Sequence, residues 1–382
     1  MRPNRAFRPW QPTGARLGCD DLIETRDPGR FTRRPLLRAA VLGQRQAAGE
    51  HEAAYESLLR PRPVLERTVV TGRVSDVSPH VLVLRTREGE ERLTLTPATT
   101  AWRGATVAPA ALHHGDWVIL RKAKPPSRGA ANPDRTRARA GWRTVVERMW
   151  AEIGRATGTI VEAKPVGQSS GSGARRGMEL LVDEGPGKGR KIVLISPDVY
   201  QQILVRFPRL QPGYLLDVIG LRQEGFLRAL TPATSQPPYR ASQVPVPPMV
   251  SGHVPDPVSG TAVWHEPGEE PASLIGLAYP AVDPETGCEH ALPDSHGIGP
   301  GCARLPYLSV GSVITVRNDC TGMSAPLPVT SCGASARLFC DRCVECRTSP
   351  RGRVADLTMA AFVALGGRLE NGCFNASISM TR

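Results

Sequence analysis

The chain has 382 residues, of which 40% are hydrophobic, 36 are Pro and 38 are Gly, and its formal net charge is +12. This length allows two or three domains, and the many Pro and Gly residues favour short strands and turns over long helices. No stretch approaches the ~18 consecutive apolar residues that a membrane span needs, so an integral membrane protein is not expected.

The charge is divided unevenly along the chain. Residues 258–382 carry 9 Arg, no Lys and 12 acidic residues, a net charge of −3, which leaves 39 basic and 24 acidic residues, a net charge of +15, in residues 1–257. A basic part of this kind suggests a polyanionic partner, such as nucleic acid, anionic lipid or a teichoic-acid-like wall polymer. A solvated Arg-rich surface explains the same charge without a partner.

The N-terminal segment, residues 1–66, is rich in Arg and lacks sustained alternation, so it is expected to be poorly ordered. Its first residues contain no apolar core of the kind that a secretion signal needs, so no signal peptide is visible.

Residues 67–122 are predicted to form a first small antiparallel β-barrel module. The segments VLVLRT and RLTLT alternate like strands, and REGEE between them is typical of a hairpin loop, with Gly89 available for positive φ. Residues 123–143 are rich in Pro, Gly and Arg and are predicted to be a basic linker.

Residues 144–232 are predicted to hold a helix followed by a second small β-barrel module. The helix is predicted because four apolar residues follow the i, i+3, i+4, i+7 spacing, namely Val146, Met149, Trp150 and Ile153. The segments ATGTIVEA and LQPGYLLDVIG then echo VTGRVSDV and LHHGDWVILRK of the first module, which pairs Gly158 with Gly72 and Gly213 with Gly115. This recurrence indicates two copies of one module.

Small barrels of this kind often bind oligonucleotides or oligosaccharides through exposed aromatic residues among basic ones. Few aromatic candidates are available here: Trp102, Trp117, Tyr200, Tyr214 and Phe226. Trp117 and Tyr214 lie in segments with a strand-like pattern, which favours burial of their side chains. Because few exposed aromatic residues then remain for ligand binding, the modules are interpreted as spacers or docking units.

A Pro-rich linker over residues 233–257 is the clearest domain boundary, and residues 258–382 form the last domain. In this domain SGTAVWHEP, SVGSVITVRND, PLPVTSCG and ASISM are predicted strands. The segment VADLTMAAFVALGG predicts a helix that Asp356 caps at its N-terminus and that Gly366 and Gly367 end.

The last domain is also rich in cysteine. Eight of the nine cysteines lie within 86 residues: Cys288, Cys302, Cys320, Cys332, Cys340, Cys343, Cys346 and Cys373. Their density and even number predict disulfides in an oxidising compartment, with a pairing that spacing does not reveal. The alternative is a zinc ion held by Cys340, Cys343 and Cys346, with Cys332 or Cys373 as the fourth ligand.

Four motifs of residues 258–382 together resemble the double-psi β-barrels of barwin, expansin and rare lipoprotein A. GTAVWHEP stands at the place of that family's opening strand, and GSVITVRNDCTG, LPVTSCG and RVADLTMAAFVALGG follow in the family's order. The predicted fold is therefore mainly β and multidomain, with two small antiparallel barrels followed by a six-stranded double-psi barrel that carries one or two short helices.

The resemblance implies a glycan groove. It places Trp264, Asn318, Thr321 and Asp356 at positions that would contact glycan, and Asp356 at the position of the acid in the family's lytic transglycosylases. The other polar positions of the family fall on Ser331 and near Cys302, and His290 or His296 could substitute only from an inserted loop. These departures favour a non-catalytic domain.

The leading hypothesis is an extracellular or cell-wall-associated protein that binds peptidoglycan or another wall polysaccharide, with no cofactor and with an anionic wall polymer as a second partner of the basic part. The alternatives are a lytic transglycosylase that uses Asp356 as general acid, and an intracellular nucleic-acid-binding protein with a Cys-ligated zinc.

Overall fold

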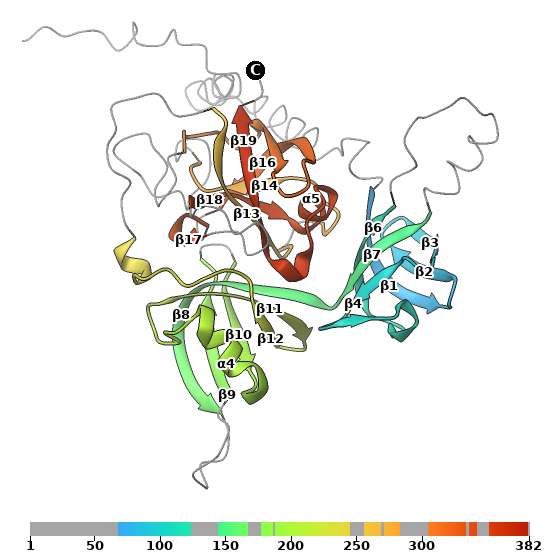
Figure 1. Cartoon of the computed structure of the whole chain (residues 1–382), viewed down its shortest axis with the longest axis horizontal. Helices are drawn as coiled ribbons and strands as arrows, with labels where there is room; N and C mark the ends of the chain where they lie inside the picture. The colour runs from blue at the N-terminus through green and yellow to red at the C-terminus, as the bar shows by residue number, and fades with distance from the viewer. Residues whose placement is uncertain are drawn as a thin grey trace, which may run out of the picture.

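The computed structural model describes residues 68–123, 144–166, 177–185, 188–244, 256–268, 271–282, 305–333, 336–341 and 351–380. In these residues the chain is mainly β, with two α-helices, and it forms one seven-stranded sheet and two closed barrels. Figure 1 shows the sheet beside the other two units, which lie one against the other. None of the described helices is long and apolar enough to cross a membrane.

The first unit is a seven-stranded sheet with the order β3-β2-β1-β6-β7-β4-β5. Its strands are β1 (Val69–Val77), β2 (Val81–Thr86), β3 (Gly89–Thr94), β4 (Thr100–Trp102), β5 (Thr106–Val107), β6 (Trp117–Lys122) and β7 (Val146–Ala151). The predicted hairpin is β2–β3, in which Thr86 pairs with Gly89. Thr94, the last residue of β3, bridges Val145 before β7, so the sheet curls toward closure.

The segment that was predicted to be a helix is strand β7. Buried and exposed residues do not alternate along this strand, because Met149, Trp150 and Ala151 are all buried. In a strand that is covered on both faces, the apolar residues can therefore match the spacing expected for a helix. β7 pairs antiparallel with β6, so residues 123–143 connect two neighbours of one sheet and are not a linker between domains. The first unit therefore extends to Ala151, past the predicted boundary at residue 122.

The second unit is a closed barrel with the strand order β10-β12-β11-β8-β9. Its elements are β8 (Ile153–Val166), β9 (Gly177–Asp183), β10 (Arg190–Ile195), α4 (Pro197–Arg206), β11 (Leu215–Gln223) and β12 (Phe226–Pro232). Its core is aliphatic apart from Phe207. Glu152, which has a φ of 49°, is the single residue between β7 and β8, so the chain passes directly from the sheet into the barrel (Figure 1).

The glycines that the sequence pairs between the two modules have the same structural roles. Gly72 in β1 and Gly158 in β8 each approach a backbone carbonyl of a neighbouring strand, that of Arg85 and that of Asp183. Gly115 and Gly213 have φ values of 86° and 87° in the turns before β6 and β11. Positive φ and close backbone approach both favour glycine, because glycine has no Cβ.

The third unit is a six-stranded closed barrel. Its elements are β13 (Val258–His265), β14 (Leu277–Tyr279), β15 (Val313–Asn318), β16 (Ser324–Cys332), β17 (Cys340–Asp341), β18 (Arg351–Thr358), α5 (Met359–Ala364) and β19 (Cys373–Met380). The ring runs β13-β19-β15-β16-β14-β18 and closes through parallel pairing of β18 with β13, while β17 extends the edge at β18. The four predicted strands of this domain correspond to β13, β15, β16 and β19.

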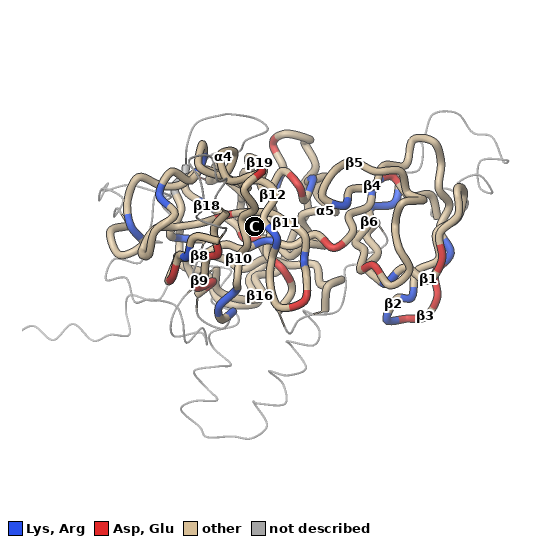
Figure 2. The backbone as a smooth tube through the Cα atoms, turned by 90° about the horizontal axis from the view of Figure 1, so that it is seen from below, with Lys and Arg blue, Asp and Glu red and all other residues tan. Residues whose placement is uncertain are grey.

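One apolar cluster joins the three units, although the second barrel and the first sheet also have cores of their own. A single cluster of buried residues contains Trp102 and Trp150 of the sheet, Ile219 of the second barrel and Phe362 of α5. Figure 2 shows α5 between the third barrel and the sheet. Arg121 of β6 donates from Nη1 to the Val363 carbonyl at 3.2 Å, which ties the sheet to the end of this helix.

The described part of the predicted linker, residues 233–244, packs closely on both barrels. Ala233 and Thr234 are fully buried, and Gln236 donates from Nε2 to the carbonyls of Arg209 and Leu215 at 2.9 Å. Tyr239 donates from its hydroxyl to the Leu338 carbonyl of the third barrel at 3.1 Å. The prediction of an extended spacer is therefore wrong for these residues, because their side chains complete the junction between the barrels.

Candidate functional site

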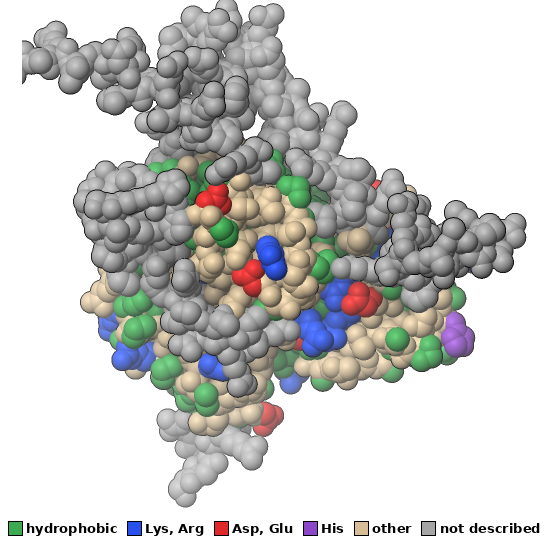
Figure 3. All heavy atoms as spheres, turned by 45° about the horizontal axis from the view of Figure 1, so that its top comes forward, with side chains coloured by type: hydrophobic (Ala, Val, Ile, Leu, Met, Phe, Trp, Pro, Cys, Tyr) green, Lys and Arg blue, Asp and Glu red, His purple; other side chains and the backbone are tan. Residues whose placement is uncertain are grey.

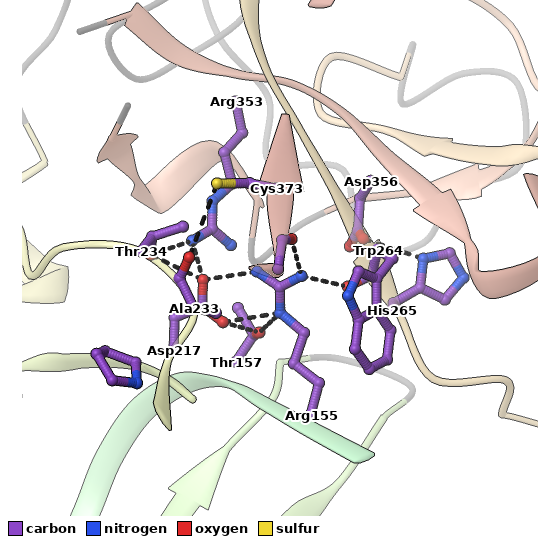
Figure 4. Close-up of polar contacts among 12 residues, drawn as sticks. Arg155, Thr157, Asp217, Ala233, Thr234, Trp264, His265, Arg353, Asp356 and Cys373 are labelled. Atoms are coloured by element: carbon purple, nitrogen blue, oxygen red, sulfur yellow. Dashed lines mark hydrogen bonds and ion pairs between the residues drawn. The ribbon is translucent and has the colours of Figure 1, made fainter. Parts of the chain in front are cut away.

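A histidine and an aspartate lie together where the third barrel faces the second. His265 is the last residue of β13, and Asp356 lies in β18, the parallel neighbour of that strand. The Nδ1 atom of His265 is 3.0 Å from Oδ1 of Asp356, and both side chains are buried (Figure 4). The sequence prediction included Asp356 but not His265, although His265 directly follows Trp264 in the motif VWHEP.

These two residues border a cavity of about 380 Å³ that both barrels line. The third barrel also contributes Glu266, and the second barrel contributes Glu184, Lys188 and Lys191. This volume lies in the range of small-ligand sites. The lining is rich in charge, which suits a ligand with many hydrogen-bonding groups better than an apolar one.

Lys191 of the second barrel connects several of the polar groups that line the cavity. Its Nζ donates to the Arg155 carbonyl at 2.8 Å and lies 3.2 Å from Glu184 Oε2 and 3.4 Å from Glu266 Oε1. Burial raises the pKa of Glu184, against the opposing effect of Lys191. Glu266 also accepts from the backbone N–H of Arg155 at 2.5 Å, so one carboxylate joins the two barrels.

Lys188 is the less constrained cation of the cavity. Its side chain is 32% exposed, and its Nζ lies 3.6 Å from Asp356 Oδ2, a longer separation than a direct hydrogen bond. A lysine in this position can turn toward a ligand while Asp356 keeps its contact with His265.

Asp356 does not cap the helix. β18 continues through Leu357 to Thr358, and Thr358 is the N-cap, whose Oγ1 accepts from the Ala361 N–H at 3.3 Å. The predicted helix start was therefore two residues too early, because pairing with β13 keeps Asp356 in extended conformation.

Asp356 is held in its ionised form. Burial by itself would raise the pKa of this carboxyl, but the Lys188 ammonium and the His265 imidazole outweigh that effect and hold its pKa well below the usual range. A general acid must carry a proton at the working pH, so this environment opposes the acid role that the family resemblance implies for Asp356.

The other three residues predicted to bind glycan have structural contacts. Trp264 borders the cavity but is 1% exposed, and its indole N–H donates to the Leu369 carbonyl at 2.9 Å. The Arg155 guanidinium lies 5.4 Å from the centre of its ring. Asn318 and Thr321 both donate to the Leu365 carbonyl at the end of α5, and neither lines the cavity.

An ionic cluster that the sequence did not predict lies beneath the cavity. Asp217 of β11 accepts from Nε and Nη2 of Arg155 at 2.8 and 2.7 Å, and from Nη2 of Arg353 in β18 at 2.5 Å (Figure 4). Thr157 and Thr234 donate to the same carboxylate. Burial alone would raise the pKa of Asp217, but the two guanidinium groups lower it to about 2. All three charged residues are buried, so they join the barrels through an interior ionic contact.

Three described cysteines differ in their chemistry. Cys320 and Cys332 are each disulfide-bonded. Cys373 is a buried thiol whose Sγ lies 3.7 Å from the Ala233 carbonyl, so its expected disulfide is not found. This thiol starts β19 at the contact with the second barrel.

The remaining cysteine predictions fall outside the description. Cys288, Cys302, Cys343 and Cys346 are not among the described residues, and of Cys340 only the backbone in β17 is described. The predicted zinc ligands are therefore not placed, and neither are His290 and His296. Within the described ranges no group of three or more His, Cys, Asp or Glu residues is arranged to hold a metal ion.

The two disulfide-bonded cysteines give a direct test. Because a thiol must be reduced to react with an alkylating agent, peptides that contain Cys320 or Cys332 should be alkylated only after reduction. Denatured protein would be treated with iodoacetamide, with and without prior reduction, and mapped by mass spectrometry. Alkylation of either residue without a reductant would contradict the disulfides.

The charged side chains that are visible on one face of the molecule are scattered. On the face in Figure 3, the visible Lys and Arg side chains are scattered, some of them beside Asp or Glu side chains, and they do not form one broad basic patch. Ser331, which stands at the family's second acidic position, is an exposed residue of β16.

The chain matches no protein-family model and no curated protein.

Proposed function

We propose that the chain is a cell-wall-associated protein that binds peptidoglycan or a related polysaccharide, and that the cavity between the second and third barrels is its glycan site. The double-psi identity of the third barrel, taken from the sequence motifs, is part of this proposal. Its six-stranded closure and its two parallel strand pairs, β13 with β18 and β14 with β16, are compatible with that identity.

The charged lining of the cavity supports a glycan ligand. Sugars present hydroxyl and acetamido groups that both donate and accept hydrogen bonds, and the cavity offers ammonium donors beside carboxylate acceptors. Glu184 and Glu266 are fixed by Lys191 and by backbone N–H groups, so these acceptors are in place before a ligand arrives. Preorganisation of this kind reduces the entropy lost on binding.

The ionised state of Asp356 carries the non-catalytic part of the proposal. Lys188 and His265 both stabilise the carboxylate, whereas protonation of a glycosidic oxygen needs the neutral acid. Replacement of Lys188 would remove one of the two groups that stabilise the Asp356 carboxylate. It would also remove the cavity cation that is most able to contact a ligand.

A lytic transglycosylase is the second candidate, and one observation favours it. Glu184 is the cavity carboxyl whose pKa is raised by burial, so it is better suited than Asp356 to hold a proton. Its contacts with Lys191 and with the Thr157 N–H both stabilise the carboxylate, which is why binding without catalysis is preferred here.

An extracellular or wall-associated location is proposed on the disulfides of Cys320 and Cys332, which persist in oxidising compartments. The disulfide of Cys332 removes that residue as a fourth thiolate for the alternative zinc site, because a bridged sulfur is not a thiolate ligand, and this leaves Cys373 as the other possible fourth ligand. Because disulfides are rare in intracellular proteins, the intracellular nucleic-acid alternative is less well supported than the wall-polysaccharide proposal.

Binding to purified peptidoglycan tests the proposal. The Lys188→Gln variant is expected to bind about tenfold more weakly than the wild type, as expected for loss of one charge-assisted hydrogen bond of ~1.5 kcal/mol. The matched control is Lys164→Gln, which makes the same charge change at a lysine that is 58% exposed and that forms an ion pair with Glu162, away from the cavity. Co-sedimentation at several protein concentrations gives the affinities. Equal affinities of both variants would exclude the cavity as the glycan site.

Catalysis is tested in the same samples. We expect no anhydro-muropeptides above background from the wild type, from Asp356→Asn or from Glu184→Gln, measured by liquid chromatography and mass spectrometry. Release by the wild type that is lost in Glu184→Gln or Asp356→Asn would establish the transglycosylase and identify its acid.

A further inference from the structure

A second charged region lies on the second barrel, apart from the cavity. It is formed by residues 206–214, from the last residue of α4 onward, and residues 233–244, after β12. Together they contain Arg206, Arg209 and Arg240 but no Asp or Glu. All three arginines are exposed. We refer to these three arginines with Tyr214 as the arginine face.

The backbone that carries the arginine face is firmly held. Phe207 and Leu210 are buried on either side of Arg209. The Gln236 side chain accepts from the Arg209 N–H at 3.0 Å and donates to the Arg209 carbonyl at 2.9 Å, so it fixes both backbone groups of that residue. The Ala241 N–H donates to the Gly213 carbonyl at 2.9 Å, which places Arg240 beside Tyr214.

Two of the arginines converge on one phenol. The guanidinium carbons of Arg209 and Arg240 each lie 5.2 Å from the centre of the Tyr214 ring. A hydrogen bond from Arg240 and the positive charges of both arginines lower the pKa of the Tyr214 phenol. Arg209 is further held by donation from Nη1 to the Pro238 carbonyl at 2.8 Å.

The charges of this face have no acidic ion-pair partner among the described residues. Instead, Arg206 donates to Ser235 Oγ and Arg209 donates to the Pro238 carbonyl, and both of these acceptors are neutral oxygens. Two guanidinium groups that lie against the same aromatic ring repel each other, and an anion bound between them would offset this repulsion. The guanidinium groups can donate in pairs to the oxygens of such an anion.

We infer that the arginine face binds the phosphate groups of a base-free phosphodiester polymer, such as a glycerol-phosphate chain. A phosphate offers several oxygens at tetrahedral positions and can accept from both guanidinium groups at once, while Arg206 is available to the next phosphate. Single-stranded nucleic acid is disfavoured because base stacking needs an open aromatic face, and both arginines lie against the ring of Tyr214. This inference does not rest on the proposed function, because none of these residues lines the cavity.

The experiment measures binding of the full chain to poly(glycerol phosphate) by calorimetry, with inorganic phosphate and a thymidine oligonucleotide as further probes. The Arg209→Gln/Arg240→Gln double variant is expected to bind the polymer at least about tenfold more weakly, given ~1.5 kcal/mol for one charged hydrogen bond. Wild-type affinity should fall roughly tenfold between 50 and 200 mM salt, as expected when two phosphates release counterions. The matched control is Arg228→Gln, an exposed arginine in β12 of the same barrel.

A second measurement does not depend on the arginine variants. Bound phosphate places negative charge beside Tyr214, so the polymer should raise the pKa of this phenol, and absorbance titration against Tyr214→Phe would show the shift. The inference is overturned if the double variant binds the polymer as well as Arg228→Gln does, if the polymer leaves the phenol titration unchanged, or if the oligonucleotide binds this face more tightly than the polymer does. Binding of inorganic phosphate without binding of the polymer would also overturn it.

Discussion

Replacement of Asp217 with Asn is expected to lower the free energy of unfolding by about 3–5 kcal/mol, the range seen when one partner of a buried ion pair is removed. Arg155 and Arg353 would then be buried without the carboxylate that neutralises them, although the shape of the side chain is kept. Urea unfolding followed by circular dichroism would measure the change.

The matched control for Asp217 is Glu162→Gln. Glu162 also pairs with a basic residue, Lys164, but the two side chains are 51% and 58% exposed. Exposed pairs contribute about 0–1 kcal/mol, so this variant should change stability little. Equal losses in the two variants would contradict the importance of the buried cluster.

The same carboxylate predicts how stability depends on pH. The pKa of Asp217 is lowered from 3.8 to about 2 in the folded chain, so the unfolded chain takes up the proton first as the pH falls. The contribution of Asp217 is therefore present above pH ~4 and is lost as the pH falls toward 2. The difference in melting temperature between wild type and Asp217→Asn should shrink over that interval.

Replacement of Gly158 with Ala is expected to destabilise the second barrel by ~3 kcal/mol or more, at or above the upper end of the usual overpacking cost. A Cβ at this position would lie 1.9 Å from the Asp183 carbonyl oxygen and 2.9 Å from the Glu184 Cα, so the β8 and β9 backbones would have to separate. Thermal unfolding and the yield of soluble protein would report the effect.

Gly225→Ala is the comparison for Gly158. Gly225 has a φ of 81°, and a Cβ there meets no atom within 4 Å, so only the backbone conformation is strained. The Gly225→Ala variant is therefore expected to lower the free energy of unfolding by about 1–2 kcal/mol. If the two alanine variants were equally stable, close backbone approach would not be the reason for glycine at position 158.

The error at Val146–Ile153 shows why apolar spacing was insufficient. Met149, Trp150 and Ala151 are buried because the first sheet packs against the other units, and that contact cannot be read from local sequence. Burial on both faces removes the alternation that normally identifies a strand. The early helix start at Asp356 has a related cause, since Asp356 and Thr358 are both good N-caps and only pairing with β13 decides between them.

The candidate site was predicted in part. The motifs selected Trp264 and Asp356, and the structure places both at the cavity, but it places Asn318 and Thr321 at the end of α5. Lys188 and Lys191 could not have been selected, because they belong to the other barrel and reach Asp356 and Glu266 only when the two barrels dock.

The sequence by itself determined the mainly β class and the glycine positions that recur at Gly72 and Gly158. These features depend on local patterns and on backbone conformation, which neighbouring residues largely specify. Only the tertiary structure decided that one apolar cluster joins the three units, that Asp217 holds Arg155 and Arg353, and that Asp356 is ionised. Burial and the distance between charges control those properties, and both depend on residues that are far apart along the chain.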